Sequence, residues 1–292
     1  MNKEIAKKIL LECLTTGGDY AEIYFEDTIK NSIKMVKLEI DDINATHLYG
    51  AGIRILKENS MVYGYTNDVS EAGLLKLAKN LRTAYKDKTI VSDFEFSDFE
   101  VANNTNFAIL SKDTPNKKKI GYLLKCNEIV TKYSDKIVQS IANFIDETQV
   151  ITIANSNGVY KQDTRNHKRV SVVAVASDGK QMQEASDSYG GNFDISYFDN
   201  YNFEEFAKNI AKSAVESLDA IDIVGGKYDV VIHNAFGGVI FHEACGHSLE
   251  ATSVSKGMSV FSNKLGEKIA ADCVTAIDDG TIYNEWGSAN ID

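Results

Sequence analysis

Two histidines and a glutamate lie close together in the segment Phe241-His242-Glu243-Ala244-Cys245-Gly246-His247. Histidine provides neutral nitrogen ligands for zinc, and a glutamate beside the first ligand can take a proton from metal-bound water. Residues of these types, so close together, predict a metal-dependent hydrolase.

The spacing of the two histidines requires an irregular helix. The usual zinc-protease pattern, H-E-x-x-H, places both rings on one face of an α-helix. This chain has one more residue, H-E-x-x-x-H. Five residues of an ideal α-helix rotate by about 500°, which leaves the second ring roughly 140° from the first. A π-turn absorbs the extra residue, so we expect a π-turn or a break between the small residues Ala244 and Gly246.

A plainer interpretation of this segment is a surface helix with two solvated histidines and an ordinary glutamate. The preceding run, Gly237-Gly238-Val239-Ile240-Phe241, is apolar. We therefore expect His242 to follow a buried segment, where an unpaired polar ring is costly. This context favours the metal site over the solvated helix.

The motif belongs to a longer pattern, Gly237-Gly238-Val239-Ile240-Phe241-His242-Glu243-Ala244-Cys245-Gly246-His247-Ser248-Leu249-Glu250. On its C-terminal side, the pattern continues with Phe261-Ser262, Gly266-Glu267 and Val274-Thr275-Ala276-Ile277-Asp278-Asp279-Gly280-Thr281. Near the N-terminus, it includes Asp19-Tyr20-Ala21-Glu22-Ile23-Tyr24-Phe25 and Gly64-Tyr65-Thr66. Together they resemble the signature of the TldD/PmbA family of metallopeptidases. The resemblance spans most of the chain, and the metal segment is its most specific part. Because the H-E-x-x-x-H residues are present, the chain resembles the catalytic TldD type, since PmbA-type members lack them.

The resemblance implies roles for the motif residues. His242 and His247 are the zinc ligands by this match, and Glu243 is the catalytic base. The family's third ligand is a cysteine near the far C-terminus, past the equivalent of residue 292, so we expect this chain to be a fragment without it. The implied function is a zinc-dependent peptidase for small or unfolded peptides. The implied assembly is a homodimer, or a heterodimer with a PmbA-like subunit, that encloses the peptide.

Other residues of the chain offer substitutes for the missing ligand. A catalytic zinc normally has three protein ligands and a water. Structural roles are more common for such residues, because lone buried cysteines usually behave as small hydrophobes. The candidates are Cys245, Glu250, Cys273, Asp278 and His233. The rival function is a non-catalytic peptide-binding or assembly module of the same fold, which the missing ligand favours for residues 1–292.

The composition is that of a globular enzyme. A chain of 292 residues, with 43% hydrophobic and 25% charged residues, can form two domains with a sizeable core. The net charge of −11 argues against a nucleic-acid surface. Four cysteines without a C-x-x-C pair fit a reducing compartment, so we expect a cytoplasmic protein. No run approaches the roughly 18 apolar residues of a membrane span.

The order of apolar residues predicts an α+β fold with a duplicated N-terminal region and mainly antiparallel sheets. The turn signals Asn157-Gly158 and Asp178-Gly179 predict hairpins. We predict two α-β(4)-α units. Their helices are expected near 6–14, 71–81, 116–133 and 203–218, and their strands near 20–26, 30–40, 46–57, 61–66, 137–146, 149–155, 169–177 and 180–189.

These elements suggest the domain boundaries. Residues 1–224 form the N-terminal region, with repeats at about 1–90 and 115–224, and residues 225–292 begin a truncated metallopeptidase domain. The stretch 87–119 joins the repeats, and we expect its last residues, Lys117-Lys118-Lys119, to be a solvated helix entry. Residues 228–232 are predicted to form a short buried strand that gives the metal helix a rigid mount.

Overall fold

The computed structural model describes residues 2–87, 91–97 and 107–291. The chain divides into two compact units. The first contains Met1–Ala220 together with Asp279–Asp292, and the second contains Ile221–Asp278. The predicted connecting stretch 87–119 lies partly outside the described residues. Among the helices that are described, none is long and apolar enough to cross a membrane.

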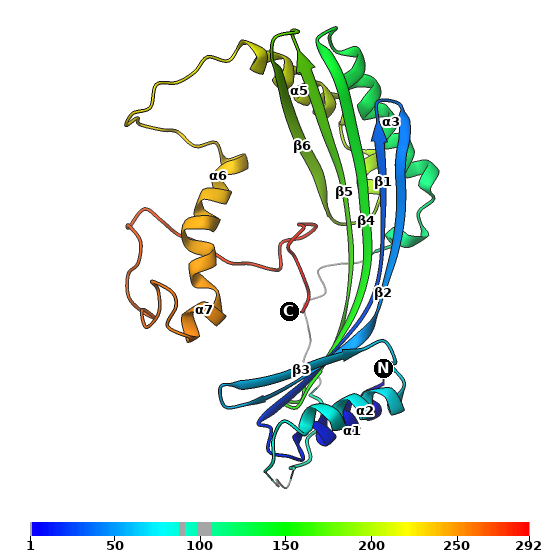
Figure 1. The fold of residues 1–292 in the computed structure, drawn as a ribbon, viewed down its shortest axis with the longest axis vertical. Coiled ribbons are helices and arrows are strands. Elements are labelled where there is room, and N and C mark those ends of the chain that lie inside the picture. The colour runs from blue at the N-terminus through cyan, green and yellow to red at the C-terminus, as the bar shows by residue number, and fades with distance from the viewer. Residues whose placement is uncertain (1, 88–90, 98–106, 292) are drawn as a thin grey trace. The chain divides into compact units, whose positions relative to one another are not determined.

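One six-stranded antiparallel sheet runs through the first unit (Figure 1). The strand order is β3-β2-β1-β4-β5-β6, so each repeat contributes three adjacent strands and the repeats meet where β1 pairs with β4. The strands are β1 (Tyr20–Val36), β2 (Glu39–Lys57), β3 (Ser60–Thr66), β4 (Ile137–Asn155), β5 (Tyr160–Ser177) and β6 (Met182–Asn192).

The mixed α+β fold and the antiparallel pairing agree with the prediction, but the prediction of four strands per repeat is wrong. Two polar stretches that were expected to separate short strands lie inside long ones, because their side chains have partners on neighbouring strands. The Asp27 carboxylate lies 2.8 Å from the His47 ring, and Glu147 lies 3.7 Å from the His167 ring. The chain turns instead at Lys37, which has a positive φ of 54° without being glycine.

Both predicted hairpin turns are confirmed. Gly158 lies between β4 and β5 with a φ of 86°, and Gly179 lies between β5 and β6 with a φ of 84°. Glycine adopts these left-handed conformations without the steric cost that a Cβ would add. The two glycines therefore set the register of the second repeat.

The four predicted helices are also present, and they pack in two pairs. In Figure 1, α1 (Lys3–Leu14) and α2 (Glu71–Arg82) lie at one end of the sheet, and α3 (Asn116–Lys132) and α5 (Phe203–Glu216) lie at the other. Each pair covers its own apolar core. Ile23 belongs to the first core and Ile33 to the second, and both are odd-numbered residues of β1. Side chains alternate along a strand, so both cores form on one face of the sheet.

The expectation that Lys119 is solvated is wrong. Its side chain is 1% exposed, and its Nζ lies 2.7 Å from the equally buried Asp146 carboxylate of β4. The side-chain amide of Asn31 on β1 donates a second bond to Asp146, at 3.0 Å. A buried charge is tolerated only when it is paired, and this pair fixes α3 on the sheet between the two cores.

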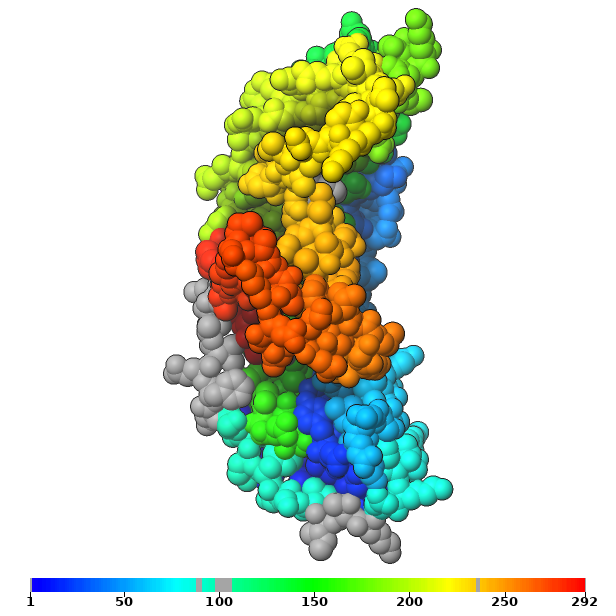
Figure 2. All heavy atoms as spheres, turned by 90° about the vertical axis from the view of Figure 1, so that its left-hand side faces the viewer, coloured from blue at the N-terminus to red at the C-terminus, as the bar shows by residue number. Residues whose placement is uncertain are grey.

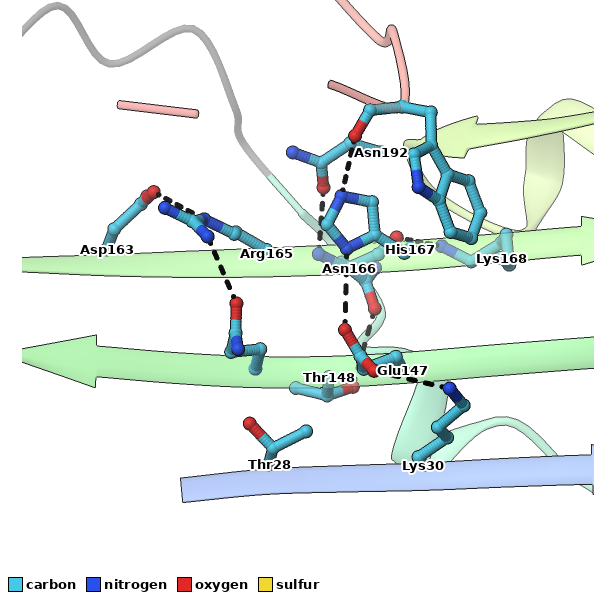
Figure 3. A network of polar contacts seen from close by, with 12 residues as sticks. Thr28, Lys30, Glu147, Thr148, Asp163, Arg165, Asn166, His167, Lys168 and Asn192 are labelled. Carbon is cyan, nitrogen blue, oxygen red and sulfur yellow. Dashed lines mark hydrogen bonds and ion pairs between the residues drawn. The ribbon is translucent and has the colours of Figure 1, made fainter. Parts of the chain in front are cut away.

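The opposite face of the sheet holds the C-terminal segment 284–291 against β5 and β6. Asp163 accepts hydrogen bonds from the backbone and side chain of Asn290, at 3.1 and 2.8 Å. Arg165 donates to the carbonyl of Ile291 at 2.7 Å, and His167 to that of Trp286 at 3.0 Å. Figure 3 shows Asp163, Arg165 and His167 on one strand, with Glu147 and Lys30 on the next two strands. Polar side chains of β5 thus hold this segment on the sheet.

The second unit, coloured yellow to orange in Figure 2, contains short helical elements. Many of its apolar side chains are exposed. The predicted buried strand at 228–232 is wrong, because these residues form no strand and Val230, Val231 and Ile232 are exposed. The apolar run before the motif is also exposed, at Val239, Ile240 and Phe241. Apolar residues become buried only where another element covers them, and within the described second unit none covers these.

Candidate metal centre

The helix that carries the motif contains the π-turn that its spacing predicted. α6 (Asn234–Phe241) is a regular α-helix, and the next residues, His242–Gly246, form a π-turn. The backbone N–H of His247 donates to the carbonyl of His242, five residues earlier. A short 3₁₀ turn, His247–Leu249, and α7 (Ala251–Ser255) follow. The extra residue of the motif is therefore absorbed in one widened turn.

The widened turn brings the two imidazoles together. The ring centroids of His242 and His247 are 4.4 Å apart, at an interplanar angle of 62°. The nearest ligand atoms of His242, Glu243 and His247 all lie within 4.8 Å of one another. Gly246 makes room for this arrangement, since a Cβ there would lie 3.0 Å from Nδ1 of His242. The three residues singled out from the sequence form one cluster.

A second carboxylate orients one of the two rings. Glu250 lies 2.6 Å from Nδ1 of His247. A carboxylate can only accept this bond, so Nδ1 carries the proton, and in the neutral ring Nε2 keeps its lone pair for a metal. The hydrogen bond to Glu250 raises the pKa of His247, and the negative charge of Glu243 adds to the effect. Glu250 is thus the hydrogen-bond partner of a ligand candidate.

The donor set fits a zinc ion. Zinc prefers imidazole nitrogens at about 2.0–2.1 Å in tetrahedral geometry, which places two such nitrogens roughly 3.3 Å apart. The nearest ligand atoms of the two histidines lie within 4.8 Å, so modest rotations of exposed side chains reach that separation. Glu243 is 65% exposed, and its carboxylate lies 3.9 Å from Nε2 of His247, the atom that would face the ion.

The other ligand candidates from the sequence lie outside this cluster. Within the residues that the structure describes, the group that could hold a metal consists of His242, Glu243 and His247. His233, Cys245, Cys273 and Asp278 do not belong to it. The described residues therefore offer two imidazoles and one carboxylate to an ion.

An apolar pocket of about 490 Å³ adjoins the motif helix within the second unit. Phe241, Cys245 and Leu249 line it from the motif segment, and Phe261 and Val274 are among the lining residues that follow in the chain. The sequence pattern did not predict this pocket. The helical spacing of Phe241, Cys245 and Leu249 was the available signal for an apolar helix face. The other lining residues, at 261 and 268–276, have no periodic pattern that would predict a pocket.

Comparison with protein families shows which family the sequence matches along most of its length. Three models of one family match the chain in order: PmbA/TldA metallopeptidase domain 1 at residues 21–84, the central domain at 109–218 and the C-terminal domain at 225–292. The motif residues lie in the third match.

Similar proteins are longer than this chain. A TldD metalloprotease homologue of Buchnera aphidicola is 25% identical over 97% of this chain and 60% of its own length. A metalloprotease of Methanocaldococcus jannaschii is 29% identical over 97% of this chain and 63% of its own length. The chain thus spans about 60% of these relatives.

Solved structures show the same fold. A crystal structure from Bacteroides thetaiotaomicron has a TM-score of 0.75 at 15% identity, covering 93% of this chain and 62% of that one. TldE from Thermococcus kodakarensis has a TM-score of 0.61 at 13% identity, covering 89% and 57%. With the three family matches in order along the sequence, the chain belongs to the PmbA/TldD metallopeptidase family.

Proposed function

We propose that the protein is a zinc-dependent peptidase of the TldD type. The observation that carries this proposal is the π-turn, which turns both imidazoles of the motif to one side, beside the Glu243 carboxylate. A bound zinc ion acts as a Lewis acid toward the scissile carbonyl and makes a neighbouring water more acidic.

In this proposal, the residues of the chain have separate tasks. His242 and His247 hold the ion, and Glu250 keeps His247 in the tautomer that leaves Nε2 free to bind. Glu243 removes a proton from the attacking water and delivers it to the leaving amine. Its position beside both rings, with a carboxylate oxygen 3.9 Å from His247, suits this transfer.

The substrates, the partner and the third ligand are also proposals. We infer small or unfolded peptides as substrates, and a homodimer or a heterodimer with a PmbA-like subunit in the cytoplasm. Because the described residues offer two imidazoles, a third ligand is needed for a catalytic zinc. We propose a cysteine in the part of the protein that follows residue 292.

A second candidate function is a non-catalytic peptide-binding or assembly module. The observation that favours it is the incomplete ligand set among the described residues. In that case, residues 1–292 would bind peptides without cleaving them.

Replacement of Glu243 by Gln separates the two functions. The variant keeps the side-chain shape and the histidines, so zinc content should stay unchanged while cleavage of unfolded peptides falls by at least about a hundredfold. The measurement compares full-length wild type, Glu243→Gln and the control Glu216→Gln at an exposed residue of the first unit, each with zinc and a candidate partner. Unchanged proteolysis in Glu243→Gln would show that another group is the base. Absence of cleavage by zinc-loaded wild type would support the binding module.

A further inference from the structure

His167 of β5 lies between two hydrogen-bond acceptors that belong to different parts of the chain. Its Nε2 lies 3.0 Å from the carbonyl oxygen of Trp286, in the C-terminal segment 284–291. Its Nδ1 lies 3.7 Å from the carboxylate of Glu147 on β4, which Figure 3 shows on one side of the ring. The His167 side chain is only 11% exposed, so water has little access to either nitrogen.

The protonated ring is the form that satisfies both acceptors. A carbonyl and a carboxylate can only accept hydrogen bonds, and a neutral imidazole has one N–H. If that proton is on Nε2, the lone pair of Nδ1 faces Glu147. If it is on Nδ1, the lone pair of Nε2 faces the carbonyl of Trp286. The imidazolium ion donates from both nitrogens, so loss of one proton deprives one of the two acceptors of its donor.

Glu147 stays ionised in the pH range where histidine titrates. The contact with His167 lowers the pKa of the Glu147 carboxyl, and Lys30 of β1, at 3.9 Å, lowers it further, although burial acts in the opposite direction. Histidine changes its charge between about pH 5 and 8. Within this pair, the ring is therefore the member that changes its charge near neutral pH.

The other charged groups around the ring have both signs. They are Arg165, Arg169 and Asp163 on the same face of β5, Lys30 on β1 and Glu285 in the C-terminal segment. Arg165 pairs with Asp163 at 3.3 Å, and Arg169 lies over the Trp286 ring. On β6, the residue opposite His167 is the uncharged Asn192. Because these charges oppose one another, both forms of the ring remain accessible.

Lys168, the next residue of β5, is a second group that titrates near neutral pH. Burial lowers the pKa of its ammonium group to about 7. Its side chain lies on the opposite face of the strand, where it donates to the carbonyl oxygens of Asn166, at 2.8 Å, and Phe193. A test of His167 must therefore separate its effect from that of Lys168.

We propose that His167 and Glu147 form a proton-controlled clamp that holds segment 284–291 on β5. The protonated ring holds the carbonyl of Trp286. The neutral ring releases this carbonyl, because the ionised carboxylate of Glu147 is the stronger acceptor for the one remaining proton. The docked segment thus favours the state that binds one more proton, so docking weakens as the pH rises. The clamp needs neither metal nor substrate, and it acts on the segment by which the chain returns from the second unit.

The test follows Trp286, the only tryptophan of the 292 residues, in the full metal-free chain at different pH values. The readouts are acrylamide quenching and the emission maximum, because an imidazolium ion beside an indole also changes the emission intensity directly. Between about pH 5.5 and 8.5, the quenching constant of wild type should rise about twofold as the segment leaves β5. His167→Gln keeps an N–H donor for Trp286 at every pH, so its quenching constant should not change.

Two further variants and a matched control complete the experiment. In Glu147→Gln, the side-chain amide can donate to Nδ1 of the neutral ring, so the rise should also disappear. Lys168→Met should keep the rise, because the hydrogen bonds of Lys168 go to Asn166 and Phe193. The control is His47→Gln, at an exposed histidine of β2 whose ring lies 2.8 Å from the Asp27 carboxylate. It should show the same rise as wild type.

Four results would overturn the proposal. These are constant quenching of wild type over this pH range, an undiminished rise in His167→Gln or Glu147→Gln, loss of the rise in Lys168→Met or His47→Gln, and a parallel change in far-ultraviolet circular dichroism. The last would show that the sheet unfolds instead of releasing the segment. If His167→Gln is misfolded, Glu147→Gln tests the clamp alone.

Discussion

At the scale of single residues, the site depends on small side chains as much as on the ligand candidates. Gly246 lies inside the π-turn, and a Cβ at this position would lie 3.0 Å from Nδ1 of His242, within the range of a tight contact. The histidine ring would have to rotate to relieve it. The absence of a side chain at Gly246 therefore lets the π-turn bring both rings to one side.

Gly246→Ala should weaken zinc binding by about tenfold, because a displaced ring loses its alignment with His247. The control is Gly238→Ala in α6, where a Cβ would meet nothing within 4 Å. Alanine stabilises helices relative to glycine, so both variants should fold. A zinc titration of the two variants and wild type measures the difference. Equal affinities in Gly246→Ala and wild type would contradict the role given to this glycine.

At the scale of elements, local patterns in the sequence predicted the features that depend on residues a few positions apart, such as helix starts and turns. The helix predicted near 71–81 is present as α2, and Ser70 caps its first turn by accepting a hydrogen bond from the N–H of Gly73. Gly158 and Gly179 supplied the turns of the second repeat. The π-turn followed from the spacing of the motif histidines alone. Each of these features involves residues a few positions apart.

Features that depend on distant residues could not be predicted in this way. Polar residues such as Asp27 and Glu147 suggested turns, but their partners on neighbouring strands keep them inside long strands. Lys119 belongs to a lysine run typical of a solvated surface, and only the position of Asp146 on β4 shows that it is buried. The apolar residues at 228–232 suggested a buried strand, although no element of the described second unit covers them.

The buried pair gives a prediction at this scale. Lys119→Met should reduce the free energy of unfolding of the first unit by about 3–5 kcal/mol, because Asp146 keeps its charge in the interior without its cation. The double variant Lys119→Met/Asp146→Leu should recover most of that loss, since it leaves no unpaired charge. Urea unfolding followed by circular dichroism measures both. A double variant less stable than Lys119→Met would contradict this account of the pair.

At the scale of the whole molecule, the second unit lies between two parts of the chain that belong to the first. The chain leaves the first unit after Ala220 and returns at Asp279. The C-terminal segment 284–291 is then held on β5 by Asp163, Arg165 and His167. At both of its ends, the unit that carries the metal motif is thus continuous with the chain of the first unit.

The only tryptophan of the chain, Trp286, reports on this attachment. Its ring centroid lies 4.0 Å from the guanidinium carbon of Arg169 and 4.9 Å from the His167 ring centroid. Asp163→Ala removes both hydrogen bonds to Asn290, so Trp286 should show red-shifted emission and stronger acrylamide quenching. Asp187→Ala, at an exposed residue of β6, is the control. Identical spectra for Asp163→Ala and wild type would show that the segment is held by other contacts.

Zinc binding by the two motif histidines tests the central claim most directly. The measurement is the zinc content of the full-length protein after dialysis, together with its titration by zinc. Wild type should hold about one zinc per chain, and His242→Ala and His247→Ala should each lose most of it, because each removes one of three expected ligands. His233→Ala, at a histidine of the same unit outside the cluster, should keep its zinc. Stoichiometric zinc in a variant that lacks both His242 and His247 would contradict the account.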